Sequence, residues 1–169
     1  MQNKIILASK SKVRKEILDK NNIYCEVKPS NVDEDIVKDS LIKEKASPEI
    51  ISKNLAELKA NKVSLNQNNQ LVLGADSVID LDGELISKPE NREEALVILK
   101  KLNGKKHHLI SSVCISKNGS MIWNYTDKAE LTMKNFTEED LKTYLSKISD
   151  EALYAYNVYP VSYTHLTLP

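Results

Sequence analysis

The sequence predicts an α/β protein in which helices flank a mixed β-sheet. Two features of the 169-residue chain lead to this class. In the first half, short apolar runs typical of strands alternate with stretches of helical periodicity. In the second half, Asn118-Gly119 separates two long strand-like stretches, which is a strong hairpin signal. Strands that first alternate with helices and then form a hairpin indicate a sheet of mixed direction.

The length and composition fit one globular domain. Lys plus Arg and Asp plus Glu each number 24, so no net charge attracts nucleic acid or an anionic membrane, and neither is expected as a partner. Cys25 and Cys114 lie far apart, without metal-like spacing, and are expected to be reduced thiols. The apolar residues 5–8 are too few for a signal peptide, and no run is long enough for a membrane span. The cytoplasm is the expected location.

The first strand-to-helix junction is a candidate anion site. Residues 4–8 predict a short buried strand, and the apolar spacing that follows predicts a helix to about residue 21. Ser9 and Ser11 lie at the junction, and Arg14 follows one turn later. Free N–H groups and the positive end of the helix dipole favour an anion there. The alternative is that the serines cap the helix and Arg14 is solvated.

An acidic cluster follows the second predicted strand, residues 24–28. Residues 31–35, Asn-Val-Asp-Glu-Asp, are expected in a loop, where such clusters usually face solvent. The alternative is that Asp33 or Glu34 helps to hold a divalent cation, because Mg²⁺ takes oxygen ligands and often uses only one or two carboxylates.

A long helix is predicted to begin at Ser47-Pro48-Glu49, where serine is the cap and proline lies in the first turn. Apolar residues from Ile51 to Val63 mark one face over about four turns. Lys59 and Lys62 lie beside that face, so either could point into a cleft, although a solvated lysine is the usual case.

The stretch from Val72 to Lys88 pairs a carboxylate with a lysine. An apolar run predicts a strand that ends at Gly74-Ala75 and delivers Asp76 beside small residues. After a hairpin signal at Asp82-Gly83, the chain reaches Lys88 directly before a proline. An acid and a base brought together beside glycine are typical of a phosphate-and-metal site. The alternative is a buried strand followed by a solvated hairpin.

The rest of the chain predicts a helix over residues 91–102 with Asn91 as its cap, the two hairpin strands over 109–116 and 121–133, and a helix opening at Thr137. Odd positions of the second hairpin strand are mostly apolar, which is the alternation of a strand. The adjacent pair His107-His108 would face opposite sides of a strand, so the two side chains are not expected to bind one metal.

Six short segments carry a family resemblance. They are Leu7-Ala-Ser-Lys-Ser-Lys-Val-Arg14, Val32-Asp-Glu34, Leu55-Ala-Glu-Leu-Lys-Ala60, Leu73-Gly-Ala-Asp-Ser-Val78, Lys88-Pro89 and Leu102-Asn-Gly-Lys-Lys-His107. In this order they resemble the Maf family of nucleoside triphosphate pyrophosphatases, relatives of the inosine-triphosphate pyrophosphatase fold. The resemblance extends from residue 4 to about residue 159.

The resemblance implies a mixed sheet flanked by helices, in two lobes around a nucleotide-binding groove, usually as a homodimer. It implies hydrolysis of a nucleoside triphosphate between the α and β phosphates, with Mg²⁺ or Mn²⁺. Asp76 would be catalytic, either as a metal ligand or as the group that orients or deprotonates water. The other implied residues are Ser9, Ser11, Arg14, Lys59 and Lys88 for the substrate, and Glu34 with Asp76 for the metal.

Two departures from the family pattern stand out. Asn103 lies where the family often has serine before a glycine. Val158-Tyr159 matches the start of a further family segment, but residues 160–169 do not continue it. We expect a single domain over residues 1–159, incomplete at its C-terminus, followed by a tail at 160–169 that is a sequencing or assembly artefact.

Three hypotheses compete for the function. The first is a nucleotide pyrophosphatase, the second a non-catalytic nucleotide-binding regulatory protein, and the third a generic α/β domain. The paired acids Glu34 and Asp76 favour the first, since a pure binder needs the cations but not the acids. The third does not explain six segments in family order. His107 after Asn103-Gly104 is closer to the family branch that acts on dTTP and UTP than to the 7-methyl-GTP branch.

Overall fold

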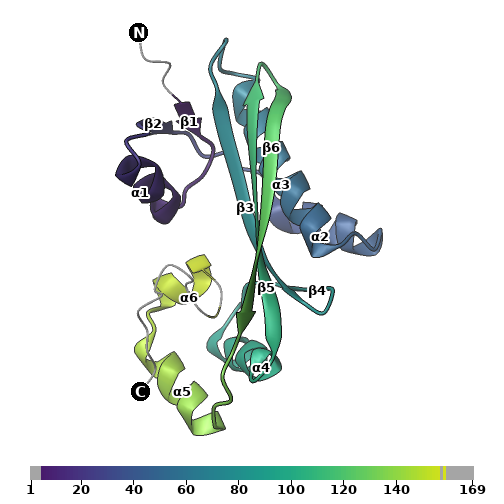
Figure 1. Cartoon of the computed structure of the whole chain (residues 1–169), viewed down its shortest axis with the longest axis vertical. Helices are drawn as coiled ribbons and strands as arrows, with labels where there is room; N and C mark the ends of the chain where they lie inside the picture. The colour runs from purple at the N-terminus through teal and green to yellow at the C-terminus, as the bar shows by residue number, and fades with distance from the viewer. Residues whose placement is uncertain (1–4, 157, 159–169) are drawn as a thin grey trace. The chain divides into compact units, whose positions relative to one another are not determined.

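The structure is a computed structural model that describes residues 5–156 and residue 158 (Figure 1). Strands and helices alternate in the first half, and a long hairpin follows in the second. The elements are β1 (Ile5–Leu7), α1 (Lys12–Lys20), β2 (Cys25–Val27), α2 (Glu34–Lys43), α3 (Pro48–Ser64), β3 (Val72–Leu81), β4 (Glu84–Ile86), α4 (Arg92–Leu102), β5 (Lys106–Lys117), β6 (Ser120–Thr132), α5 (Glu138–Lys147) and α6 (Asp150–Tyr156).

The sheet is mixed, as the sequence predicts. Its six strands run in the order β2-β1-β3-β5-β6, with β4 paired to β3. β1 is parallel to both β2 and β3, whereas β4 is antiparallel to β3. The predicted fold class, a mixed sheet flanked by helices, is therefore confirmed.

The chain divides into two compact units, to which β3, β5 and β6 all contribute. The first comprises Met1–Val78 and Leu109–Ala129, and the second comprises Ile79–His108 and Glu130–Pro169. The nucleotide-binding groove and the single domain over residues 1–159 stay predictions. The expected tail, residues 160–169, lies outside the described residues.

In the first unit, α3 packs unusually close to β3. A Cβ atom added at Gly74 would lie 2.2 Å from the carbonyl oxygen of Ala56 and 2.7 Å from the amide nitrogen of Ala60. Ala56 and Ala60 also pack against Cys114 of β5 in a buried cluster. Small residues on both elements let the helix backbone approach the strand.

This packing corrects one prediction. Gly74-Ala75 does not end the strand, because β3 continues from Val72 through Asp76 to Leu81. The small residues mark the place where α3 approaches, so Asp76 lies in the middle of a strand and is buried.

A second prediction is wrong in part. Residues 31–33 lie outside the helices and strands, as expected of a loop, but Asp33 caps α2, and Glu34 and Asp35 lie in its first turn. The Asp33 side chain accepts a hydrogen bond from the Ile36 amide at 3.2 Å. Carboxylates at this end of a helix complement the positive end of its dipole, which explains why an acidic segment begins a helix.

The other helix starts follow the sequence. Ser11, Ser47 and Asn91 cap α1, α3 and α4, and Thr137 forms a capping box with Asp140 at α5. In each case a side-chain oxygen accepts an otherwise unpaired backbone N–H of the first turn.

In the second unit, Asn103 ties the end of α4 to the segment before α5. Its side chain accepts from the Phe136 amide and donates to the Phe136 carbonyl, both at 2.9 Å. Arg92 donates to the carbonyl oxygens of Leu145 and Ile148 near the end of α5. These contacts hold α4 and α5 together.

β6 is a strand, as predicted, but its apolar side chains are largely exposed. Met121, Trp123 and Tyr125 are 40%, 48% and 56% exposed, and the two aromatic rings stack with centroids 6.2 Å apart. The alternation therefore reports strand geometry and not burial. None of the helices in the described part of the chain is long and apolar enough to cross a membrane.

Candidate active site

The junction between β1 and α1 gathers hydroxyl and amide groups. Ser11 caps α1 and accepts a hydrogen bond from the Arg14 amide at 3.3 Å. The buried Ser9 hydroxyl accepts from the Ser11 amide at 3.2 Å and from Nη1 of Arg14 at 3.1 Å. Ser11 therefore caps the helix, as the alternative interpretation predicted. That interpretation also placed Arg14 in solvent, whereas its guanidinium donates to the protein.

The Arg14 guanidinium continues the hydrogen-bond ladder of the sheet where β1 stops. The amides of Ile6 and Ala8 donate to the carbonyl oxygens of Leu71 and Leu73. The next carbonyl on the same edge belongs to Ala75, and Nη1 of Arg14 donates to it at 2.9 Å. The side chain thereby occupies the position that another residue of β1 would take.

Lys59 joins two carboxylates. Its Nζ lies 2.7 Å from Oδ1 of Asp76 on β3 and 2.9 Å from Oε1 of Glu34 on α2. Lys59 and Asp76 are each only 5% exposed. The sequence placed two lysines beside the apolar face of α3. Lys59 enters the site, whereas Lys62 donates to the carbonyl oxygen of Asn31 at 2.7 Å.

Asp76 has one carboxylate oxygen without a hydrogen-bond partner in the described part of the chain. Oδ2 is buried and accepts no hydrogen bond from the described residues. Burial raises the pKa of the Asp76 carboxyl, and the Lys59 ammonium opposes that rise. Burial also lowers the pKa of the Arg14 guanidinium, against the attraction of Asp76 and Glu34. A buried polar atom with no partner is costly unless a ligand or ion completes it.

The structure brings most of the predicted residues together and leaves one prediction open. In the first unit, Ser9 contacts Arg14, and Lys59 links Glu34 to Asp76. Lys88 follows β4 in the second unit, so its place in the site stays a prediction.

Two further side chains were missed from the sequence. Nη2 of Arg14 lies 3.5 Å from the Ser77 hydroxyl, which lies 3.0 Å from the Ser111 hydroxyl on β5. Ser77 follows Asp76 directly, and neighbouring side chains of a strand face opposite sides, so the sequence separated Ser77 from Asp76 and did not indicate its contact with Arg14. Nothing in the sequence pointed to Ser111, because its position depends on the pairing of β5 with β3.

Glu34 and Asp76 could supply some, but not all, of the ligands that a divalent cation needs. No group of three or more His, Cys, Asp or Glu side chains suited to a metal occurs among residues 5–156 and 158. Glu34 and Asp76 offer two carboxylates, and Oδ2 of Asp76 lacks a partner in the described structure. Mg²⁺ commonly binds through one or two carboxylates together with substrate phosphates, so the set suits an ion that arrives with a phosphorylated ligand.

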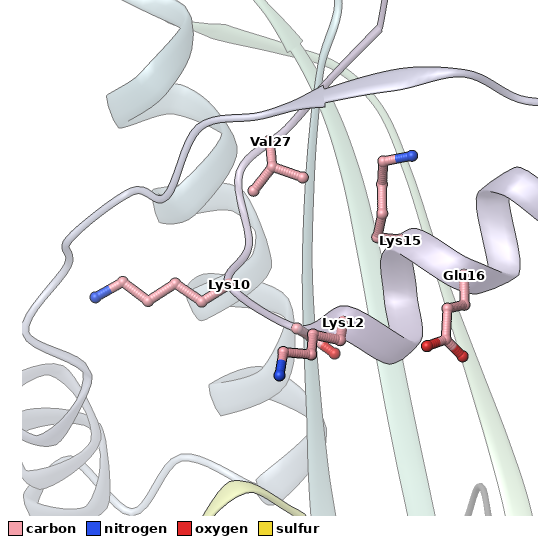
Figure 2. Close-up of a pocket in the computed structure, with 6 residues that line it drawn as sticks. Lys10, Lys12, Lys15, Glu16 and Val27 are labelled. Carbon is pink, nitrogen blue, oxygen red and sulfur yellow. The ribbon is translucent and has the colours of Figure 1, made fainter.

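A basic hollow lies beside the start of α1. It has a volume of about 350 Å³ and is lined by Lys10, Ser11, Lys12, Lys15, Glu16 and Val27 (Figure 2). Figure 2 shows Lys10 extending from the segment before α1 and Lys12 from the start of the helix. This end of α1 therefore carries local positive charge in a chain with no net charge.

The family model described as "Maf-like protein" matches residues 4–157. The chain belongs to the Maf-like family. A nucleoside triphosphate pyrophosphatase of Pelagibacter ubique is 70% identical over 161 residues, which cover 95% of this chain and 83% of that protein. A 7-methyl-GTP pyrophosphatase of Rhizobium etli is 32% identical, with 94% of this chain and 80% of that protein covered.

Among solved structures, a HAM1 protein from Coxiella burnetii matches the Maf-like chain at a TM-score of 0.46 and 12% identity, over 75% of this chain and 70% of that one. The fold assignment rests on the strand order and directions given above.

Proposed function

We propose that this Maf-like chain is a nucleoside triphosphate pyrophosphatase, which hydrolyses a nucleotide to its monophosphate and pyrophosphate. The observation that carries the proposal is the buried Asp76 carboxylate. One oxygen is held by Lys59 and the other has no partner among the described residues. The Arg14 guanidinium of the same unit attracts this carboxylate. The names of the similar proteins support the same activity.

The phosphate chain would be held at the start of α1. Ser9 and the first-turn amides can donate to phosphate oxygens, and Arg14 adds a planar fork. Lys59 supplies a buried positive charge beside Asp76, and we propose Lys88 as a further cation from the second unit. Phosphoryl transfer depends mainly on such positioning and charge neutralisation.

Asp76 would act on the attacking water. Its raised pKa makes the carboxylate a better proton acceptor than an exposed aspartate, and Oδ2 is the oxygen available for that role. Glu34 and Asp76 would hold Mg²⁺ or Mn²⁺, which when bound neutralises phosphate charge and activates water.

Two further proposals concern the state of the protein. We propose that the protein works as a homodimer. Light scattering of the purified chain tests this, and a monomer at the assay concentration would contradict it. We also propose a cytoplasmic location, supported by Cys25 and Cys114, which are both free thiols.

The activity is tested with a nucleotide panel of dTTP, UTP, GTP and 7-methyl-GTP in the presence of Mg²⁺. Pyrophosphate and orthophosphate are measured separately, with a chelator as the metal control. Release of pyrophosphate together with the monophosphate is expected. Release of orthophosphate alone would refute cleavage between the α and β phosphates. Tight binding without turnover would instead favour a regulatory nucleotide-binding protein.

A further inference from the structure

The Arg14 side chain is held from both ends of its guanidinium group. Nη1 donates to the Ala75 carbonyl and to the Ser9 hydroxyl, at 2.9 and 3.1 Å. Both hydrogens of that nitrogen are therefore engaged. Among residues 5–156 and 158, Nη2 donates only to the Ser77 hydroxyl, at 3.5 Å. An arginine carries five N–H donors in a rigid plane. In the described part of the chain no residue accepts a hydrogen bond from the Nε–H or from the second Nη2 hydrogen, so both donors are available to a ligand.

The Nη2 end of this group is held by the weaker contact, since the two bonds at Nη1 fix the opposite end. Hydrogen bonds tolerate some bending, so without a contact at Nη2 the guanidinium can tilt about Nη1, and the two remaining donors are then aimed less well. The Ser77 contact opposes this tilt, but Ser77 is exposed and a serine hydroxyl rotates readily. Ser111 removes that freedom, because its hydroxyl lies 3.0 Å from the Ser77 hydroxyl.

We infer that Ser111 is a positioning residue of the phosphate site, acting through Ser77 on Arg14. This inference rests on the proposed function for its ligand, a triphosphate. Ser111 is half-buried on β5, in the same unit as Ser77 and Arg14. When Ser77 accepts from Arg14, its own hydrogen is directed to Ser111, and the remaining donors of Arg14 stay aligned for two phosphate oxygens.

The neighbouring residue on β5 provides a matched control. Ser112 is buried and its hydroxyl lies 2.9 Å from the Thr126 hydroxyl, so it makes a hydroxyl pair of the same kind. Ser112 makes no hydrogen bond to Arg14 or Ser77 in the described structure. Ser112→Ala therefore removes an equivalent hydrogen bond from the same strand and leaves the Arg14 plane in place.

The experiment measures KM and kcat for pyrophosphate release from dTTP and UTP, and Kd for inorganic triphosphate. Ser111→Ala should raise KM and Kd by about 2- to 10-fold, the usual worth of one hydrogen bond, with kcat nearly unchanged. Ser111→Thr, which keeps the hydroxyl, should restore both values. Ser112→Ala should change neither KM nor Kd. In an Arg14→Lys background, which lacks the fork, Ser111→Ala should have no further effect.

Several results would overturn the inference. The first is an unchanged Kd for triphosphate in Ser111→Ala. The second is a rise in Kd in Ser112→Ala as large as that in Ser111→Ala. The third is an effect of Ser111→Ala on Kd that is as large in the Arg14→Lys background as in the wild type. If Ser111→Ala does not fold, Ser77→Ala breaks the same contact from its other side and should raise Kd alike. If the wild-type chain releases no pyrophosphate yet Ser111→Ala still weakens triphosphate binding, the proposed function fails and the inference holds. A wild-type chain that binds no triphosphate contradicts both.

Discussion

Gly74→Ala should separate α3 from β3 and thereby damage the site. The added Cβ would lie 2.2 Å from the Ala56 carbonyl oxygen, whereas real Cβ atoms rarely approach a neighbour more closely than 3.0–3.4 Å. The atoms it meets belong mainly to the helix backbone, so no side-chain rotation relieves the contact. The helix must therefore move away by about 1 Å, at a cost of about 1–3 kcal/mol for an overpacked interior.

The displacement has a specific chemical consequence. Lys59 lies on α3 between Ala56 and Ala60, and its Nζ is 2.7 Å from Oδ1 of Asp76. A retreat of about 1 Å carries this contact beyond hydrogen-bonding distance. Misplacement of that size can reduce an enzyme rate by about 10²-fold, and we expect a loss of that order here. The assay measures urea unfolding and pyrophosphate release on the same preparation.

Gly83→Ala is the matched control. Gly83 has a positive φ of 88°, but a Cβ added there would meet nothing within 4 Å. Its replacement should cost about 1–2 kcal/mol in backbone strain and leave turnover near the wild-type value. A Gly74→Ala protein that is destabilised but turns over normally would show that the spacing of α3 and β3 does not set the Lys59–Asp76 contact, and would refute this reasoning.

Three other changes test the site and the fold. Asp76→Asn should leave a folded protein that still binds nucleotide, since the cations remain, while turnover falls by about 10²–10⁴-fold; wild-type turnover would remove Asp76 from the mechanism. Glu138 has its pKa lowered to about 2 by the ammonium groups of Lys100 and Lys142. Its stabilisation is present above the ordinary value of 4.5 and is lost as pH falls towards 2, so Glu138→Gln should lower the melting temperature at pH 6 but not at pH 2; an equal loss at both values would contradict this. Asn103→Ala removes two hydrogen bonds to Phe136 and should cost about 1–3 kcal/mol in urea unfolding, with Asn103→Ser intermediate; a neutral alanine variant would show that this tie is not needed.

Local chemistry was readable from the sequence. The caps at Ser47, Asn91 and Thr137 and the turn at Asn118-Gly119 were predicted correctly. Each depends on hydrogen bonds or backbone angles within about four residues, and such information is contained in the neighbouring side chains. The family pattern added the candidate residues of the site, although it did not show how they contact one another.

The tertiary structure decided where those side chains go. Gly74 was read as the end of a strand, and only the packing of α3 shows that it is a point of close approach. Glu34 was placed in a loop, yet it begins a helix and meets Lys59 there. Ser111 carried no signal at all, because its contact with Ser77 exists only once β5 lies beside β3. These contacts join residues far apart in the chain, and their distances depend on strand order and helix spacing, which no local pattern of residues specifies.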